Sequence, residues 1–244
     1  MVSRLSLRER LLRIMDDKHH WAYPSLTRPG LSRAQLLEHF RHEYAVYVRD
    51  FPVLLARALG CVPPLPDVRE ALAENIYEEQ TGGISQTAAH PALFLVMMKG
   101  LGFDADLFDD ENLHPAAADY KNWLRERAVT GPWQCGVALL TLFVEGSRNE
   151  RGELDGTYTR PQGDEAVKHH ALVVHYGCPP EAMKLTRAHG DIEGSHRGDA
   201  WRIIETHVKG DALEDAVVST LTEAKERWLR YRDGVAERMG LVRS

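Results

Sequence analysis

Apolar residues recur at intervals of three and four positions along most of the 244-residue chain, and this spacing predicts helices throughout. The clearest run covers residues 31–60, where Ser32 is placed as an N-cap and Gly60 as a stop. Pro52 is expected to kink or break this run, because proline removes a backbone donor and clashes with the preceding turn. Further helices are expected at 65–80, 90–102, 115–129, 133–147, 163–177, 179–208 and 211–240.

The segment "WQCGVALLTLFVEGS", residues 133–147, is apolar on nearly every face of a helix. A helix of this kind belongs at the centre of a protein. The breaks rich in glycine and proline are short, and none is typical of an interdomain linker; they lie at 61–66, 81–89, 103–113 and 150–163. The pattern therefore predicts an all-α fold in a single domain, residues 1–244, with seven or eight helices.

Composition excludes several classes of protein. Hydrophobic residues make up 43% and charged residues 27%, which is ordinary for a globular protein. The net charge of −6 disfavours a nucleic-acid partner. No segment has the apolar length of a membrane span, and the charged first twenty residues are unlike a signal peptide, so no membrane partner is expected. Three distant cysteines, Cys61, Cys135 and Cys178, favour a reducing, cytoplasmic setting.

Histidines and acids are concentrated in "AHGDIEGSH", residues 188–196. His189, Glu193 and His196 lie four and then three positions apart, so they share one face of a helix. Imidazole nitrogen and carboxylate oxygen are ligands that suit iron, zinc or manganese. The alternative is a solvated helix face whose side chains pair at a spacing of four.

Three further candidate ligands lie in or beside the apolar helices. Glu145 follows the run "ALLTLFV", where a buried carboxylate needs a metal ion or an arginine as partner. Glu79 closes the helix expected at 65–80, and His90 opens the next one. With the three residues of 188–196 they supply three carboxylates and three histidines, a set that suits two iron ions between helices. Histidines bonded to backbone carbonyls are the ordinary alternative.

Taken in order, these residues resemble the haem-oxygenase-like di-iron oxidases and oxygenases, a superfamily that also contains pyrroloquinoline-quinone synthase and the TenA proteins. That family shows a helical N-x3-E, a histidine before an apolar helix, a glutamate late in a central helix, and H-x3-(D/E)-x2-H. This chain carries Asn75 with Glu79, His90 in "HPALF", Glu145 in "LFVEGS", and the last motif at 189–196. The resemblance covers most of the chain and implies a haem-oxygenase-like bundle.

The resemblance implies that two Fe²⁺ ions are bound per chain by six side chains: Glu79, His90, Glu145, His189, Glu193 and His196. Many relatives carry aspartate where this chain has Glu193, and the longer arm puts in doubt how tightly the second iron is held. Glu78 is the adjacent alternative to Glu79, with a side chain about 100° away around the helix. Glu79 and Glu145 are also expected to act in catalysis.

The N-terminal third, from "HHWAYPSLTRPGLS" onward, is most similar to the death-domain-associating proteins that make p-aminobenzoate from their own tyrosine. Tyr23 falls where the sacrificed tyrosine of those proteins lies, so it is a further catalytic candidate. The alternative is an ordinary aromatic residue that packs against Trp21 or a helix end.

The implied activity is the oxidation of a small organic substrate by O2, in a biosynthetic or natural-product pathway. Relatives carry out N-oxygenation, oxidative C–C cleavage and decarboxylation. Among possible substrates we favour one derived from an amino acid. Its carboxylate could be bound by Arg148, Lys168 or Arg187, although solvation at the surface is the expected state of each. An external electron donor and a homodimer are both compatible with the resemblance.

Two other classes of function remain open. A cofactor-free oxidase like pyrroloquinoline-quinone synthase would bind an aromatic acid in the same cavity without metal, and a TenA-like enzyme would need a cysteine nucleophile. A non-catalytic protein that binds a small molecule would keep the helical bundle, but would have no reason to bring six ligands together.

Overall fold

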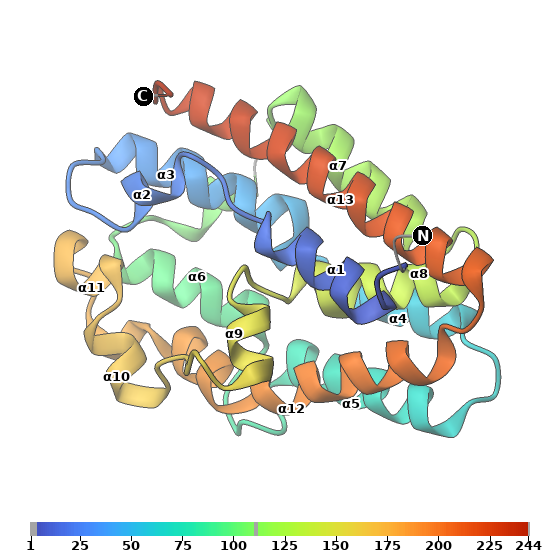
Figure 1. The fold of residues 1–244 in the computed structure, drawn as a ribbon. Coiled ribbons are helices and arrows are strands. Elements are labelled where there is room, and N and C mark those ends of the chain that lie inside the picture. The colour runs from blue at the N-terminus through green and yellow to red at the C-terminus, as the bar shows by residue number, and fades with distance from the viewer. Residues whose placement is uncertain (1–3, 110–111, 244) are drawn as a thin grey trace.

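Helices form all of the regular structure in residues 4–109 and 112–243, which a computed structural model of the protein describes. The side chains of residues 190–196 lie outside this description. Figure 1 shows α13, Asp211–Arg238, beside α7, Pro115–Arg127, along one side of the molecule. On the opposite side α12, Lys184–His207, lies beside α5, Pro66–Thr81. The all-α prediction is confirmed.

The described residues contain thirteen α-helices, more than the seven or eight expected. The helix expected at 163–177 is divided into α10, Gly163–Lys168, and α11, Ala171–Tyr176. The break lies at His170, whose backbone is extended and whose side chain accepts a hydrogen bond from the N–H of Leu172. The short helices α1, Leu7–Asp16, α2, Tyr23–Leu26, and α9, Glu150–Asp155, were not expected as helices.

The long run at 31–60 is broken near Pro52, as predicted. It forms α3, Arg33–Glu43, the π-helical segment η1, Tyr44–Val48, and α4, Phe51–Cys61, which carries Pro52 in its first turn. Proline is tolerated there because the first backbone N–H groups of a helix have no partner within it. The stop predicted at Gly60 falls one residue early, since α4 includes Cys61.

Ser32 caps α3 as predicted. Its hydroxyl accepts from the N–H of Gln35 at 3.3 Å, and the Gln35 side chain accepts from the N–H of Ser32 at 2.8 Å. We expect Ser32→Ala to lower the free energy of unfolding by about 1 kcal/mol, because the variant leaves a helix donor without its acceptor. Urea denaturation measures the loss. Ser32→Asp keeps an acceptor and serves as the control; equal destabilisation by both variants would contradict the capping role.

The central helix is continuous with a π-helical segment. Helix α8, Trp133–Ala138, runs into η3, Leu139–Val144, and every residue from Cys135 to Phe143 is buried. This confirms the central position that its apolar character predicts. Segments of π-helix are frequent at functional sites because the wider turn displaces side chains and carbonyls from their regular positions.

The loop from α5 to α6, His90–Gly100, brings the ends of two helices together. Helix α5 ends at Gly82, whose φ of 64° is the left-handed conformation that glycine adopts without strain. A Cβ atom at Gly82 would lie 2.5 Å from the carbonyl oxygen of Ala88, so the loop closes tightly over this residue. The last turn of α5 therefore faces the first residue of α6.

The remaining segments complete the bundle. The 3-10 turns η2, Ala105–Phe108, and η4, Pro180–Ala182, lie beside α6. Helix α9 packs against α1. None of the helices in the described ranges combines the length and the apolar character that crossing a membrane requires.

Candidate metal centre

A cavity of about 180 Å³ lies between η1, α5, α6, η3 and α12. Its polar wall includes Glu79, His90, Glu145 and His189, and its apolar wall includes side chains from η1, α4, η3 and α12. The cavity therefore brings together residues that are as much as 150 positions apart in the sequence, from Tyr47 to Arg197. Both π-helical segments contribute to its walls, η1 through Tyr47 and η3 through Thr141.

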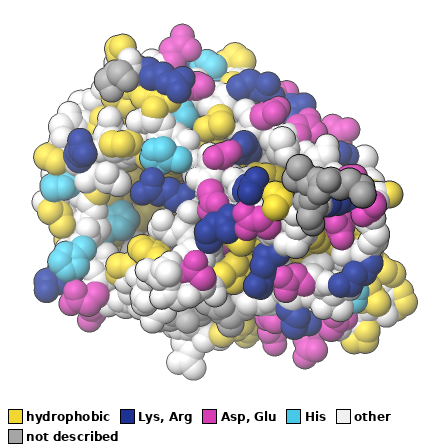
Figure 2. Space-filling view, viewed as in Figure 1, with side chains coloured by type: hydrophobic (Ala, Val, Ile, Leu, Met, Phe, Trp, Pro, Cys, Tyr) yellow, Lys and Arg dark blue, Asp and Glu magenta, His cyan; other side chains and the backbone are white. Residues whose placement is uncertain are grey.

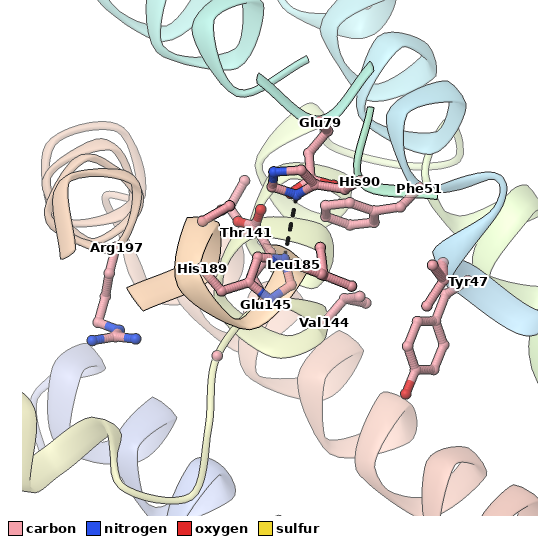
Figure 3. A pocket seen from close by; sticks show the side chains of 13 residues that line it. Tyr47, Phe51, Glu79, His90, Thr141, Val144, Glu145, Leu185, His189 and Arg197 are labelled. Atoms are coloured by element: carbon pink, nitrogen blue, oxygen red, sulfur yellow. Dashed lines mark hydrogen bonds and ion pairs between the residues drawn. The ribbon is translucent and has the colours of Figure 1, made fainter. Parts of the chain in front are cut away.

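Three predicted ligands converge inside this cavity. The Nδ1 atom of His90 lies 2.8 Å from Oε1 of Glu79 and 3.3 Å from Nε2 of His189. One donor atom from each of the three lies within 4.8 Å of the other two. Figure 3 shows the two histidine rings close together, joined by a dashed line, with Glu79 beside them and Tyr47 and Arg197 standing apart on opposite sides. The two rings meet edge to face, with an interplanar angle of 66°.

The helix ends explain this convergence. Glu79 lies in the last turn of α5 and His90 is the first residue of α6, so the tight loop at Gly82 places them side by side. His189 projects from α12, which contacts both α5 and α6. Contacts among three helices thus produce a cluster that no single helix could form.

Glu78 has a role that the sequence analysis considered only as a substitute for Glu79. Its side chain is 0% exposed, and its Oε1 atom lies 3.1 Å from Nε2 of His90. Its Oε2 atom accepts hydrogen bonds from the backbone N–H groups of Ile84 and Ser85, at 2.8 and 3.0 Å. Burial alone would raise the pKa of Glu78, but donors from Ser85, Ile84 and His90 outweigh it and lower the pKa. Glu78 therefore remains an anion that orients the His90 ring.

Glu145 faces the same cavity from the end of η3. Asn75 donates to both of its carboxylate oxygens, at 3.0 and 3.2 Å. Desolvation raises the pKa of Glu145 to about 8, and the charge of Glu79 adds to the effect while Asn75 opposes it. Two carboxylates that disfavour each other's ionisation are stabilised when a cation lies between them.

The two histidines differ in their protonation. Desolvation lowers the pKa of His189 to about 4, so its imidazole is neutral and keeps a lone pair at neutral pH. Burial would also lower the pKa of His90, but Glu79 and Glu78 outweigh it and raise the pKa. A proton on His90 thus links the three converging donor atoms, and a metal ion would take the place of that proton.

The donor set fits a transition metal. It offers imidazole nitrogen and carboxylate oxygen, and Glu78 supplies the hydrogen bond that holds a ligating histidine in orientation. The buried Oδ1 atom of Asn75 has no hydrogen-bond partner among the described residues, so the amide is positioned by Glu145 alone. Two of the six predicted ligands, Glu193 and His196, belong to α12, but their side chains lie outside the described residues.

Arg197 lines the cavity and was not anticipated from the sequence. Its Nε atom lies 3.1 Å from Oε1 of Glu150, and its guanidinium also pairs with Glu153. The Glu150 side chain is buried and accepts a further hydrogen bond from Nε1 of Trp201 at 2.9 Å. These contacts join α12 to α9 beside the segment that carries the last predicted ligands. The sequence alone did not mark Arg197 as a cavity residue, because its acidic partners lie more than forty positions away along the chain.

The other candidates lie elsewhere. Tyr23 is absent from the described walls of this cavity, and its ring stacks on Trp228 with centroids 5.9 Å apart, rather than on Trp21. Lys168 and Arg187 also lie outside these walls; they pair with Glu165 at 3.8 Å and Asp164 at 2.8 Å, respectively. The exposed Arg148 lines a separate cavity, described below.

Known structures share this fold. A TenA homologue from Pseudomonas syringae superimposes with a TM-score of 0.72 at 15% identity, over 95% of this chain and 93% of that chain. A domain of unknown function with a haem-oxygenase-like fold, from Shewanella denitrificans, gives a TM-score of 0.70 at 18% identity, over 98% and 95%. These likenesses confirm the predicted haem-oxygenase-like fold. No curated protein matches the sequence significantly.

The sequence also matches a family model. The model describes iron-containing redox enzymes, and the match covers residues 38–228, which include all six predicted ligands. This match spans most of the chain, and it agrees with the histidine and carboxylate cluster around the cavity. The chain therefore belongs to the family of iron-containing redox enzymes.

Proposed function

We propose that this protein uses O2 to oxidise a small organic substrate at two iron ions bound in the cavity. The observation that carries the proposal is the convergence of Glu79, His90 and His189, with Glu145 in the same cavity wall. These four residues would hold the metal together with Glu193 and His196. Bound iron supplies the one-electron chemistry that reaction with O2 requires.

The protein's own residues have three tasks in this reaction. Glu78 holds the His90 ring in place, and Asn75 does the same for the Glu145 carboxylate. Glu145 carries a proton near neutral pH in the metal-free chain, because its pKa is about 8, and releases it when a cation binds. Phe51, Val144 and other apolar side chains of the cavity wall limit the access of water to the reacting groups.

The thiols do not support a nucleophilic-cysteine enzyme of the TenA type. No cysteine is among the described residues that line the cavity. Burial raises the pKa of the Cys178 thiol to about 11 and also raises that of Cys135, so both thiols stay protonated at neutral pH. Cys61 is exposed, on the last turn of α4.

Anaerobic titration with Fe(II) tests the proposal. We expect saturation at about two Fe(II) per chain, as in other carboxylate-bridged dinuclear centres of helical bundles. When O2 is then added, it should be consumed in proportion to the bound iron. Saturation at one iron would overturn the dinuclear centre. Absence of iron binding, with oxidation of an organic acid intact, would establish a cofactor-free oxidase instead.

The hydrogen bond between Glu78 and the predicted ligand His90 can be tested separately from the ligands themselves. We expect Glu78→Gln to weaken Fe(II) binding by about tenfold, because the amide no longer holds the His90 ring by a charged hydrogen bond. Competition with a fluorescent chelator measures the change. The exposed Glu74 lies on the same helix, and Glu74→Gln is the matched control. Equal affinities for Glu78→Gln and the unaltered protein would show that Glu78 has only a structural role.

A further inference from the structure

Two more cavities adjoin the metal cavity and form a series with it. An inner chamber of about 190 Å³ shares Tyr47 and Val144 with the metal cavity. An outer cavity of about 460 Å³ shares Lys18, Tyr23 and Trp228 with the inner chamber. The shared side chains place the chamber beside the candidate metal centre on one side and, on the other, beside a cavity between α2, the end of η3 and α13.

The charged side chains that line the chamber and the outer cavity are basic. Lys18, His19, Arg28 and Arg148 line the outer cavity, and no aspartate or glutamate is among its described lining residues. Lys18 and Arg232 line the inner chamber, again without an acid in the described walls. Figure 2 shows histidine, lysine and arginine side chains beside a hollow on one face of the molecule. Such a surface attracts anions.

Arg232 is a buried cation in the wall of the chamber. Its side chain is 6% exposed, and it donates to Glu43 and, at 2.6 Å, to the hydroxyl of Tyr47. The buried Nε–H has no acceptor among the described residues. Glu43 balances one positive charge, which leaves the charge of Lys18 without a carboxylate partner among the described residues of the chamber.

Lys18 is held by the backbone rather than by an acid. Its ammonium donates to the carbonyls of Phe143 and Gly146, at 2.5 and 2.6 Å, where η3 ends. The Nζ atom lies 4.8 Å from the centre of the Phe143 ring and 5.8 Å from that of Trp228. Desolvation lowers the pKa of Lys18 to about 7, and the charge of Arg232 adds to the effect, while Glu150 opposes it and Arg160 adds to it weakly. An anion in the chamber would favour the charged form of this lysine.

We propose that the chamber binds the carboxylate of a monocarboxylic acid whose apolar body extends past Tyr47 and Val144 into the metal cavity. Lys18 and Arg232, which both line the chamber, provide the positive charge. Val48, Phe51 and Leu185 provide the apolar wall for the other end of the molecule. This arrangement places the carboxylate beside Lys18 and Arg232 and the apolar body in the metal cavity.

The binding of such an acid does not depend on iron, whereas its assignment as the substrate rests on the proposed function. Calorimetric titration of the full-length protein, before and after anaerobic addition of Fe(II), separates the two. The probes are phenylacetate, 3-phenylpropanoate and octanoate, each compared with its amide. We expect at least one acid to bind about tenfold or more tightly than its amide, because the ion pair and the charged hydrogen bond are absent from the amide complex.

Variants identify the chamber as the site. Arg232→Gln and Lys18→Met should each remove most of the preference for the acid over its amide. Arg230→Gln alters an exposed arginine on the same helix and should leave the preference unchanged. Because Arg232→Gln removes the arginine that pairs with Glu43, the double variant Glu43→Gln/Arg232→Gln provides a second measurement in which that carboxylate is neutral as well.

The outcomes are separable. Equal binding of all three acids and their amides, or an acid preference that survives in the chamber variants, would overturn the carboxylate site. Iron binding and O2 consumption would then still stand or fall by their own titration. Acid binding without any iron binding would keep the chamber as an organic-acid site and remove the proposed oxidase.

Discussion

His189→Ala is expected to lower the affinity for Fe(II) by about a hundredfold or more, since loss of a ligand should exceed the tenfold to hundredfold cost of losing an outer hydrogen bond. Among the predicted ligands His189 is well prepared for metal, because desolvation lowers its pKa to about 4 and keeps the ring neutral. It is also the described ligand that α12 contributes, so its removal leaves Glu79 and His90 facing each other from the adjoining ends of α5 and α6.

The measurement is an anaerobic Fe(II) titration followed by O2 consumption. His175→Ala is the matched control, because His175 is exposed on α11 and lies outside the cavity. The thermal midpoints of the metal-free proteins show whether each variant folds. Unchanged iron affinity in a folded His189→Ala protein would remove this histidine from the metal centre.

Glu145→Gln is expected to have opposite effects on metal binding and on the stability of the metal-free protein. It should weaken Fe(II) binding at least about tenfold, since an amide lacks the negative charge with which a carboxylate would neutralise the metal. In the metal-free protein the carboxyl has a pKa of about 8 instead of 4.5, so the folded state retains a proton that the unfolded state releases. The contribution of this group to stability is therefore complete below pH 4.5 and is lost as the pH rises to 8.

Glutamine does not titrate, so the variant should escape this loss. At pH 8 we expect the free energy of unfolding of the metal-free Glu145→Gln protein to exceed that of the unaltered protein by about 4 kcal/mol, and at pH 4.5 we expect little difference. Urea denaturation with a chelator present measures both values. The exposed Glu126, changed to glutamine, is the control. A constant difference between the two pH values would show that Glu145 ionises freely in the folded state.

The helical fold could be predicted from local pattern because helix formation depends on neighbours three and four positions away. The N-cap at Ser32, the break at Pro52 and the central position of α8 follow from a few adjacent residues each. The short helices at 163–177 could not be resolved in the same way, because His170 breaks the run through a local hydrogen bond that apolar spacing does not reveal.

The identities of Glu79, His90, Glu145 and His189 were also available from the sequence, since their spacing resembles that of a known family. Their convergence depends on tertiary contacts: the loop at Gly82 joins α5 to α6, and α12 packs across both. Glu78 shows the limit of local reasoning. Helical geometry directs it away from Glu79, yet the returning loop supplies donors from Ile84 and Ser85, and His90 meets both carboxylates.

The basic chamber is entirely a product of tertiary structure. Lys18 and Arg232 are separated by more than two hundred positions, and each looks in the sequence like an ordinary solvated cation on an amphipathic helix or at its end. Packing of α13 against α1 and η3 brings them together among aromatic rings. Short-range spacing therefore specifies which helices form and which ligands they carry. The helix packing decides which charges share a cavity, because electrostatic neighbours are defined by distance in space and not by distance along the chain.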